Sequence, residues 1–576
     1  MCRQVIIKDK DKWLCFKKPL EIIQADTIAN TEEAVKKAFE HSQQGKYSVG
    51  FVKYEAARAF DDSLRTKHET NSNLPLAWFA IFEDYSLINI EEYSNNPVLS
   101  ELNWQIDTPY QDYRNHISEI KKQIALGNTY QVNYTLRLKS DFNISPLSFF
   151  ASTASQSDAG YCCFIETEEF AICSFSPELF FKYDKGEIIT KPIKGTIARG
   201  RSLEGDLDAK QKLRKSEKDM AENVMIVDML RNDLGTIATP GSVEVPKLFE
   251  LETYPTLHQM SSTITAQTNE NAFEVFKHLF PCASITGAPK CRTMEIISAL
   301  ETSPRDVYTG SIGYFAPSEK AVFNVAIRTV EIDKTTDSAT YGVGGGIVWD
   351  STAENEYNEC LTKTKVLNQR TEDFELLESL LWSSDSGFYL LELHLSRISK
   401  SAEYFGFKYD QKKITDRLEE AARSLDKNTY KIRLLLAKDG AITVESQAVN
   451  IDSSTVKLAI SKEPVSSSNL YLYHKTTCRN IYQKAFEQRG DCDEVILFNE
   501  KNEVTECTFH NIIFEKDSKL YTPPIESGLL AGVMRKKMIT DGQLEEKVIK
   551  LNDINKFDNI YVINSVRKMR KAIILE

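Results

Sequence analysis

The chain has 576 residues, of which 41% are hydrophobic and 27% charged, and a formal net charge of −12 at pH 7. This length exceeds what one hydrophobic core supports, and the composition is that of a folded globular protein, so an intrinsically disordered chain is excluded. The acidic balance argues against a general nucleic-acid-binding surface, which needs clustered Lys and Arg.

Secretory and membrane-spanning segments are not indicated. Charged residues interrupt the apolar ones within residues 1–10, unlike the apolar core of a secretory signal. No segment approaches the roughly 20 apolar residues that cross a bilayer. The 11 cysteines lack the paired C-x-x-C spacing of a zinc site, which favours free thiols. We therefore expect a cytoplasmic protein without nucleic-acid or membrane partners.

Helical and alternating patterns are mixed through the first 370 residues. Apolar residues recur at helical spacing over 113–126, where Gly127 and Asn128 end the pattern. Strands are predicted at 47–54, 131–136, 161–166, 170–174, 179–183, 308–315, 321–331 and 340–348, the last three in one sheet. Further helices are predicted at 31–41, 216–228, 272–279, 291–299 and 354–367. This order predicts an α/β (α+β) fold class.

The segment 192–196 places Lys194 between a proline, which fixes φ, and a glycine, which permits close approach of a ligand. A lysine in such a loop is most often a solvated cation. Carboxylates also occur at Glu178, in the acidic run 219–233 and at 354–359, and an amine in a carboxylate-rich cleft can act as a nucleophile. Both interpretations remain open on these residues alone.

Two carboxylates of the predicted helix 354–367 share one of its faces. Glu356 and Glu359 are three residues apart, and Glu222 can complete an oxygen-ligand set from another helix. Mg²⁺ is bound by one or a few such carboxylates together with water and substrate oxygens. Acidic helix faces are mostly solvated, so spacing alone does not decide between a metal site and a surface.

A change of pattern near residue 370 predicts a domain boundary. Beyond it, strands at 431–437, 494–498 and 511–514 alternate with helices near 393–405 and 480–488. The chain is therefore expected to contain two α/β regions, 1–370 and 371–576.

The first region contains seven motifs in a fixed order: 176–178, 192–196, 227–234, 285–290, 308–314, 325–329 and 344–359. Together they resemble the chorismate-using enzymes, which include component I of anthranilate synthase and of aminodeoxychorismate synthase, isochorismate synthase and salicylate synthase. The resemblance implies a large α/β sandwich of two facing sheets. Isochorismate and salicylate synthases carry a water-activating lysine where this chain has Gln131. Lys194 stands where anthranilate synthases usually have alanine and aminodeoxychorismate synthases commonly have lysine, which implies amination at C4 of chorismate.

The same resemblance implies roles for individual residues. Lys194 would be the nucleophile and Glu178 the general acid, and His258 matches an active-site histidine. Mg²⁺ would be held through Glu222 and Glu356 or Glu359. Substrate would contact Thr196, Gly287, Tyr308, Arg328, Gly344 and Lys363, with Arg328 and Lys363 serving the enolpyruvyl carboxylate. Asn223 stands where the family usually has histidine.

The second region has motifs at 394–397, 474–477, 493–499, 504–511 and 528–533. They resemble those of fold-type IV pyridoxal-phosphate enzymes, the group of branched-chain aminotransferases and aminodeoxychorismate lyase. The resemblance implies that Lys475 attaches the cofactor and that Glu506 holds its pyridinium nitrogen. Arg397 and the amides near Gly532 and Val533 would bind its phosphate, and Asn511 belongs to the same cofactor-binding set. Taken alone, Lys475 is more typical of a surface lysine.

The two resemblances together imply a bifunctional enzyme of 4-aminobenzoate and folate biosynthesis. Chorismate and ammonia would give 4-amino-4-deoxychorismate, and elimination would then give 4-aminobenzoate and pyruvate. No glutaminase-like region is apparent, so a separate glutamine amidotransferase subunit is expected to supply ammonia, and the second region allows a homodimer. The alternatives are an anthranilate synthase component I fused to a branched-chain-type aminotransferase, and a binding protein without turnover.

Overall fold

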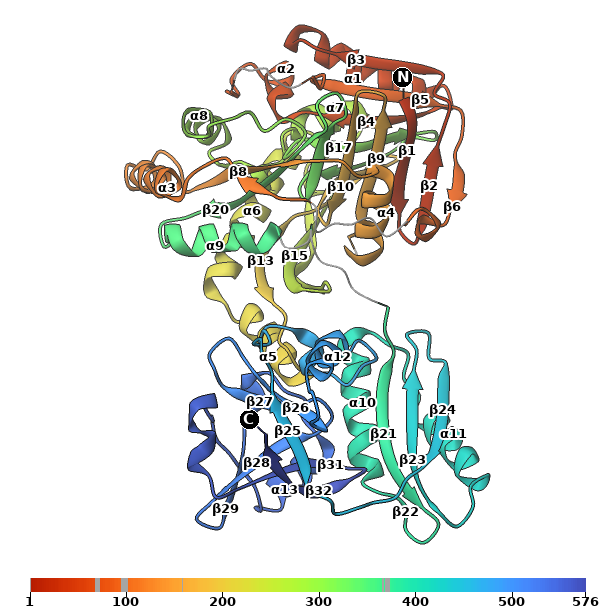
Figure 1. Ribbon diagram of the computed structural model, residues 1–576. Coiled ribbons are helices and arrows are strands. Elements are labelled where there is room, and N and C mark those ends of the chain that lie inside the picture. The colour runs from red at the N-terminus through yellow and green to blue at the C-terminus, as the bar shows by residue number, and fades with distance from the viewer. Residues whose placement is uncertain are drawn as a thin grey trace. The chain divides into compact units, whose positions relative to one another are not determined.

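The computed structural model describes residues 2–67, 73–94, 102–157, 159–364, 367 and 373–575. The chain forms two compact units (Figure 1). Unit 1 contains Met1–Ala198 and Lys210–Thr371, and unit 2 contains Arg199–Ala209 and Glu372–Glu576. The predicted boundary at residue 370 lies outside the described residues. No helix of the described residues is long and apolar enough to cross a membrane.

Unit 1 is built on two antiparallel sheets of ten strands each. The first has the order β16 (Gly287–Ala288), β8 (Gln131–Asp141), β20 (Ser338–Ile347), β19 (Thr329–Asp333), β10 (Phe170–Ser176), β9 (Tyr161–Thr167), β1 (Cys2–Asp9), β2 (Lys12–Phe16) and β6 (Ser86–Ile88), with β7 (Gln105–Ile106) paired to β8. The second has the order β13 (Ile193–Ala198), β15 (Leu257–Gln267), β12 (Glu187–Lys191), β11 (Leu179–Asp184), β18 (Lys320–Val325), β17 (Ser311–Ala316), β4 (Tyr47–Val52), β5 (Ala77–Phe82) and β3 (Glu21–Ala25), with β14 (Glu244–Thr253) paired to β15.

The sheets face each other across a buried apolar layer. Val5 and Ile172 from the first sheet pack in one cluster with Phe51, Trp78 and Ile312 from the second. Helices cover the outer faces: α1 (Ile28–Gln43), α6 (Glu217–Gly235) and α7 (Ala272–Leu279) on the second sheet, and α3 (Tyr110–Ala125), α4 (Pro146–Ser157) and α9 (Ala353–Thr364) on the first. α8 (Lys290–Leu300) contributes to both clusters, and α2 (Ala57–Phe60) is a single turn. The predicted two-sheet α/β sandwich is confirmed.

One strand prediction was wrong in a way that matters for the site. The pattern over 321–331 predicts one strand, in one sheet with 308–315 and 340–348, but the chain passes from β18 in the second sheet to β19 in the first. Arg328 has φ of 50° at this crossing. A left-handed conformation interrupts strand geometry, so the chain can change sheets there. This conformation places Arg328 at the junction of the two sheets.

Unit 2 contains two sheets. A four-stranded sheet has the order β22 (Gly387–Phe388), β21 (Leu376–Ser383), β23 (Thr429–Leu436) and β24 (Ile442–Ala448). An eight-stranded sheet has the order β27 (Val504–Cys507), β26 (Glu494–Phe498), β25 (Val456–Ile460), β32 (Lys568–Ile574), β31 (Asn559–Asn564), β28 (Asn511–Lys516), β29 (Lys519–Thr522) and β30 (Glu545–Glu546). The helices are α10 (Leu391–Phe405), α11 (Gln411–Arg423), α12 (Asn480–Glu487) and α13 (Val533–Thr540), and α10 and α11 cover the smaller sheet.

The segment Arg199–Ala209, which begins directly after β13, belongs to unit 2, and α5 (Leu203–Arg214) starts within it. The Arg199 guanidinium donates to both carboxylate oxygens of Asp206, at 2.7–3.2 Å, and lies 3.9 Å from the ring centroid of Tyr404. The carbonyl of Arg201 lies 3.1 Å from Nε2 of His474. This short segment is therefore part of the packing around the residue that precedes Lys475.

We predict that Arg199→Ala destabilises unit 2 locally. Asp206 is 2% exposed, and removal of its bidentate partner leaves a buried carboxylate undercompensated, at a cost of about 3 kcal/mol. Hydrogen exchange of the α10 amides in the intact chain measures the change. Arg231→Ala is the control, because the Arg231–Asp228 pair is solvent-exposed and contributes about 0.5 kcal/mol. Equal protection of α10 in both variants would contradict this assignment.

Candidate active sites

Unit 1 contains a cavity of about 170 Å³ that collects side chains from both sheets and from α6 and α9. Most of the predicted site residues line it: Glu178, Lys194, Thr196, Glu222, Tyr308, Arg328, Gly344, Glu356, Glu359 and Lys363. Five further polar residues that the sequence analysis did not assign to the site also line it: Asn133, Lys218, Asp219, Gln259 and Ser284. The structure therefore brings together residues up to 230 positions apart in the chain (Asn133 to Lys363).

Two predicted site residues do not line this cavity. His258 is fully buried in β15, whereas its neighbour Gln259 lines the cavity. Successive side chains of a strand point to opposite faces, so only one of the two can face the cavity. Gly287 pairs with Val132, and a Cβ at Gly287 would lie 2.0 Å from the carbonyl oxygen of Gln131. The geometry gives Gly287 a role in strand pairing and brings neither residue to the cavity.

Lys194 lies on β13, next to the carboxylates of the cavity. Burial lowers the pKa of Lys194, and the charges of Glu222 and Glu178 oppose that shift. A Cβ at Gly346 would lie 3.1 Å from Nζ of Lys194 and 2.8 Å from Nε2 of Gln131, so the glycine keeps this space open. The lysine is thus a desolvated amine beside open space, the state in which an amine is nucleophilic.

Glu178 is the proton donor best placed in this cavity. It is 3% exposed, and burial raises its pKa to about 7, although a hydrogen bond with Ser284 and the charge of Lys194 act in the opposite direction. Its Oε1 atom has no hydrogen-bond partner in the described part of the chain. A carboxyl group with this pKa is protonated in a large fraction of molecules at neutral pH.

The other carboxylates differ in their surroundings. Burial raises the pKa of Glu222 and of Glu356, and Ser351 donates a hydrogen bond to Glu356 at 2.7 Å. Glu359 forms an ion pair with Lys363 at 2.8 Å, which lowers the pKa of Glu359. Among the described residues no three His, Cys, Asp or Glu side chains are grouped closely enough to hold a metal. One or two of these carboxylates, with water and substrate oxygens, still form a donor set that suits Mg²⁺.

Two cations of the cavity pair with its carboxylates, Lys363 with Glu359 at 2.8 Å and Lys218 with Glu222 at 3.8 Å, whereas Arg328 does not. Arg328 has no ion pair in the described part of the chain, and it lies 5.8 Å from the ring centroid of Tyr254. The Lys363 ammonium donates to the carbonyl of Gly344 at 2.8 Å. Uncompensated positive charge in a small cavity favours an anionic ligand.

Asn223 links α6 by a hydrogen bond to β13, the strand that carries Lys194. Its amide lies within 3.4 Å of the Lys194 carbonyl, and Ser262 donates to its Oδ1 at 2.6 Å. The residue was noted in the sequence only as a departure from the usual histidine. The structure assigns it to positioning of the backbone of β13 relative to Glu222.

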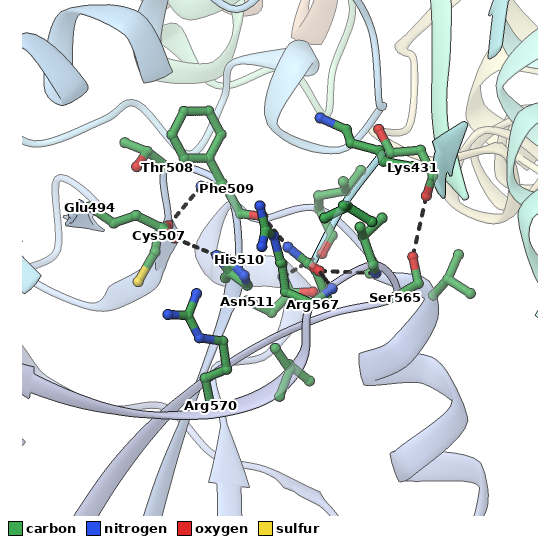
Figure 2. Close-up of a pocket in the computed structure, with 18 of the residues that line it drawn as sticks. Lys431, Glu494, Cys507, Thr508, Phe509, His510, Asn511, Ser565, Arg567 and Arg570 are labelled. Atoms are coloured by element: carbon green, nitrogen blue, oxygen red, sulfur yellow. Dashed lines mark hydrogen bonds and ion pairs between the residues drawn. The ribbon is translucent and has the colours of Figure 1, made fainter. Parts of the chain in front are cut away.

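Unit 2 contains a larger cavity, of about 940 Å³ (Figure 2). All six residues predicted to bind the cofactor line it: Arg397, Lys475, Glu506, Asn511, Gly532 and Val533. Burial lowers the pKa of Lys475 to about 7, and the charges of Arg397 and Arg479 add to this shift. A large part of the lysine is therefore a free amine at neutral pH, as attachment to an aldehyde requires.

Glu506 is a buried carboxyl group with three hydrogen-bond donors. Tyr482 donates to it at 2.7 Å, the Leu530 amide at 3.1 Å and Asn511 at 3.0 Å. Burial raises its pKa to about 7, against these hydrogen bonds. A carboxylate fixed in this way fits the ring nitrogen of pyridoxal phosphate. Asn511 acts here by orienting Glu506.

The residues predicted to bind the phosphate also line this cavity. The Arg397 guanidinium donates to both oxygens of Glu378, at 2.8 and 2.6 Å, and this contact orients it. Burial opposes ionisation of Glu378, but the charges of Arg397 and His394 lower its pKa to about 2. Gly532 caps the N-terminus of α13, and a Cβ there would overlap Oδ1 of Asn511 at 1.8 Å. Helix N-terminal amides next to an arginine form a site that suits a phosphate group.

Comparisons with known proteins match each of the two regions to a family. Residues 3–369 match the chorismate binding enzymes, and residues 375–573 match the class IV amino-transferases. The chain is 30% identical over 364 residues to aminodeoxychorismate synthase component 1 of Bacillus subtilis (strain 168), which covers 56% of this chain and 77% of that protein. It is 39% identical over 295 residues to a probable chloroplastic aminodeoxychorismate synthase of Oryza sativa subsp. japonica.

The rice match covers 50% of this chain but only 33% of the relative, so this chain corresponds to about a third of that protein's length. Among solved structures, anthranilate synthase component I from Streptococcus pneumoniae TIGR4 has a TM-score of 0.55 at 22% identity, and covers 64% of this chain and 92% of that chain. At this identity the likeness shows the fold alone. Because the first match extends over more than half of its residues, the chain belongs to the chorismate binding enzyme family, and a class IV amino-transferase region follows in the same chain.

Proposed function

We propose that residues 1–370 convert chorismate and ammonia to 4-amino-4-deoxychorismate, and that residues 371–576 convert this product to 4-aminobenzoate and pyruvate, toward folate. The observation that carries the proposal is Lys194, a desolvated amine in one cavity with the protonatable Glu178. The alternative, an anthranilate synthase fused to an aminotransferase, leaves Lys194 without a role. Product analysis with chorismate, Mg²⁺ and ammonium distinguishes the two.

In the first reaction, the Lys194 amine attacks C2 of chorismate, and the C4 hydroxyl leaves as water with the proton of Glu178. Ammonia then attacks C4 and expels the lysine, which is again a free amine. Division of one displacement into two steps is the advantage of nucleophilic catalysis. Arg328 and Lys363 bind the enolpyruvyl carboxylate, and Thr196, Tyr308 and the Gly344 backbone contact the substrate. Glu222 and Glu356 or Glu359 would hold Mg²⁺, which neutralises carboxylate charge.

In the second reaction, pyridoxal phosphate supplies an electron sink when bound. Lys475 would attach the cofactor and, once the substrate's amino group has taken its place, the freed amine would remove the proton from C4 of the substrate. Glu506 would hold the pyridine nitrogen, and Arg397 with the amides of Gly532 and Val533 would bind the phosphate. Elimination of enolpyruvate from C3 makes the ring aromatic, which makes this step strongly favourable.

The enzyme also needs a source of ammonia. We infer that a separate glutamine amidotransferase subunit supplies it, and we predict a homodimer through unit 2. All 11 cysteines are free thiols, which supports a reducing cytoplasmic location.

Lys194→Ala tests the nucleophile. We expect it to lower kcat for aminodeoxychorismate formation by about 10⁴-fold, since a covalent route is lost, with little change in the dissociation constant of chorismate. Lys320→Ala, at a half-exposed lysine of β18, is the control. Amination by Lys194→Ala at the wild-type rate would refute the nucleophile assignment.

The pH dependence tests Glu178. The acid form is required and its pKa is about 7, so kcat/KM for amination should fall as the pH rises above about 7. The concentration of neutral ammonia must be held constant at each pH, because ammonium also titrates. Glu178→Gln should lower the rate by about 10²–10⁴-fold and remove this alkaline limb. Persistence of the limb in Glu178→Gln would assign the proton to another group.

Lys475→Ala tests whether unit 1 forms aminodeoxychorismate and unit 2 converts it to 4-aminobenzoate. With chorismate, Mg²⁺ and ammonium, this variant should accumulate aminodeoxychorismate, and a separately added lyase should restore 4-aminobenzoate. Borohydride should no longer fix the cofactor to the chain, whereas it should still do so in the exposed-lysine control Lys457→Ala. Undiminished 4-aminobenzoate formation, or dependence of the wild type on a 2-oxo acid, would defeat the lyase assignment.

A further inference from the structure

The cavity of unit 2 is lined by cations that the cofactor does not account for. Besides Arg397 and Lys475, the lining includes Lys431, Arg433, Arg479, Arg567 and Arg570. Arg433 pairs with Glu445 and Arg570 with Asp452, each at 3.1 Å. Lys431, Arg479 and Arg567 have no ion pair to a carboxylate in the described part of unit 2. Figure 2 shows Lys431 and Arg567 among the residues that line this cavity.

The carboxylates that line the cavity are engaged elsewhere. Glu494 contacts His510 and accepts from the Phe509 amide at 3.0 Å, and Asp493 accepts from the Lys457 amide at 2.8 Å. Glu506 is held by its three donors, as described above. None of the described carboxylates that line the cavity therefore forms an ion pair with Lys431, Arg479 or Arg567, although the charge of Arg479 acts on Glu506.

These three cations line one cavity, and hydrogen bonds hold the two arginines in place. The charges of Arg433, Arg567 and Arg479 add to burial in lowering the pKa of Lys431, and no carboxylate opposes them. Arg479 stacks 4.4 Å from the ring centroid of Tyr482 and donates to the Thr508 carbonyl at 2.6 Å. Arg567 donates to the Asn450 carbonyl at 2.8 Å. Like charges at short range repel, so such a cluster suits an anionic ligand.

Arg479 lies nearest to the chemistry. It stacks on Tyr482, which donates to Glu506 at 2.7 Å, and it lines the same cavity as Lys475. Lys431 and Arg433 alternate with Ile432 on β23 and therefore share one face of that strand. The cluster thus extends from the reacting lysine to the smaller sheet.

We propose that Lys431, Arg479 and Arg567 form a subsite that selects substrates with two carboxylates. This inference rests on the proposed function, in which the substrate carries one carboxylate on the ring and another on the enolpyruvyl group. An α-amino acid with a single carboxylate would leave part of the cluster uncompensated. The subsite therefore favours the cyclic dicarboxylate over ordinary aminotransferase substrates.

A matched pair of aromatic amines tests the subsite in the full-length holoenzyme. 5-Aminoisophthalate and 3-aminobenzoate differ by one carboxylate, and the absorbance of the bound cofactor reports their binding to unit 2 without turnover. The wild type should bind the dicarboxylate about tenfold or more tightly, the effect of one charge-assisted contact. Lys431→Ala, Arg479→Gln and Arg567→Ala should reduce this ratio to about threefold or less.

The same variants should raise the KM for aminodeoxychorismate by about tenfold or more, with the cofactor content unchanged. Arg433→Ala and Arg570→Ala are matched controls, since each arginine lines the cavity but has its own carboxylate partner. Arg567→Lys should recover part of the selectivity, because it retains the charge; this variant also serves if Arg567→Ala does not fold.

Three results would overturn the subsite: an unchanged ratio in the variants, an equal loss in the two controls, or loss of the cofactor itself, which would assign the cluster to the phosphate. Failure of the proposed function is a separate outcome, because wild-type enzyme would then make no 4-aminobenzoate while the binding ratio could still be measured.

Discussion

Both units depend on the removal of a lysine amine from water. Burial lowers the pKa of Lys194 and of Lys475, and the free energy required to desolvate a charge is offset when the amine is neutral. Each amine also lies near a carboxyl group whose pKa burial raises, Glu178 in unit 1 and Glu506 in unit 2. Desolvation therefore favours a nucleophilic amine and a protonatable carboxyl group in the same cavity.

The remaining charges determine what each cavity can hold. In unit 1, Glu359 and Lys363 neutralise each other in an ion pair. Glu222 and Glu356 can contribute negative charge to bind a cation, and Arg328 can contribute positive charge to bind an anion. That distribution suits a cation and a carboxylate-bearing ligand together. In the cavity of unit 2, each of the described carboxylates has a hydrogen-bond or ion-pair partner and the cations outnumber them, which suits an anionic ligand.

The chain passes between the two units more than once, because unit 2 contains Arg199–Ala209 as well as the C-terminal region. The segment Arg199–Ala209 begins directly after the strand of Lys194, yet its Arg199 and Arg201 contact Tyr404 and His474 in unit 2. Substitutions in this part of the chain are therefore expected to act on the environment of Lys475. A boundary drawn by motif order alone would assign them to the other unit.

The sequence by itself determined the family, the two-sheet sandwich and the order of most helices. Of the eighteen residues predicted for the sites, all but His258 and Gly287 line one of the two cavities. The order of the motifs predicts the family and its site residues because residues that are distant in the sequence must come together around one ligand. Tertiary structure alone decided that β18 and β19 lie in different sheets, because a left-handed Arg328 has no signature in an alternating pattern. It also decided that Gln259, and not His258, faces the cavity, since strand register sets which face each side chain occupies. The cluster of Lys431, Arg479 and Arg567 could not be predicted either, because it depends on how separate elements pack and on where every nearby carboxylate finds its partner.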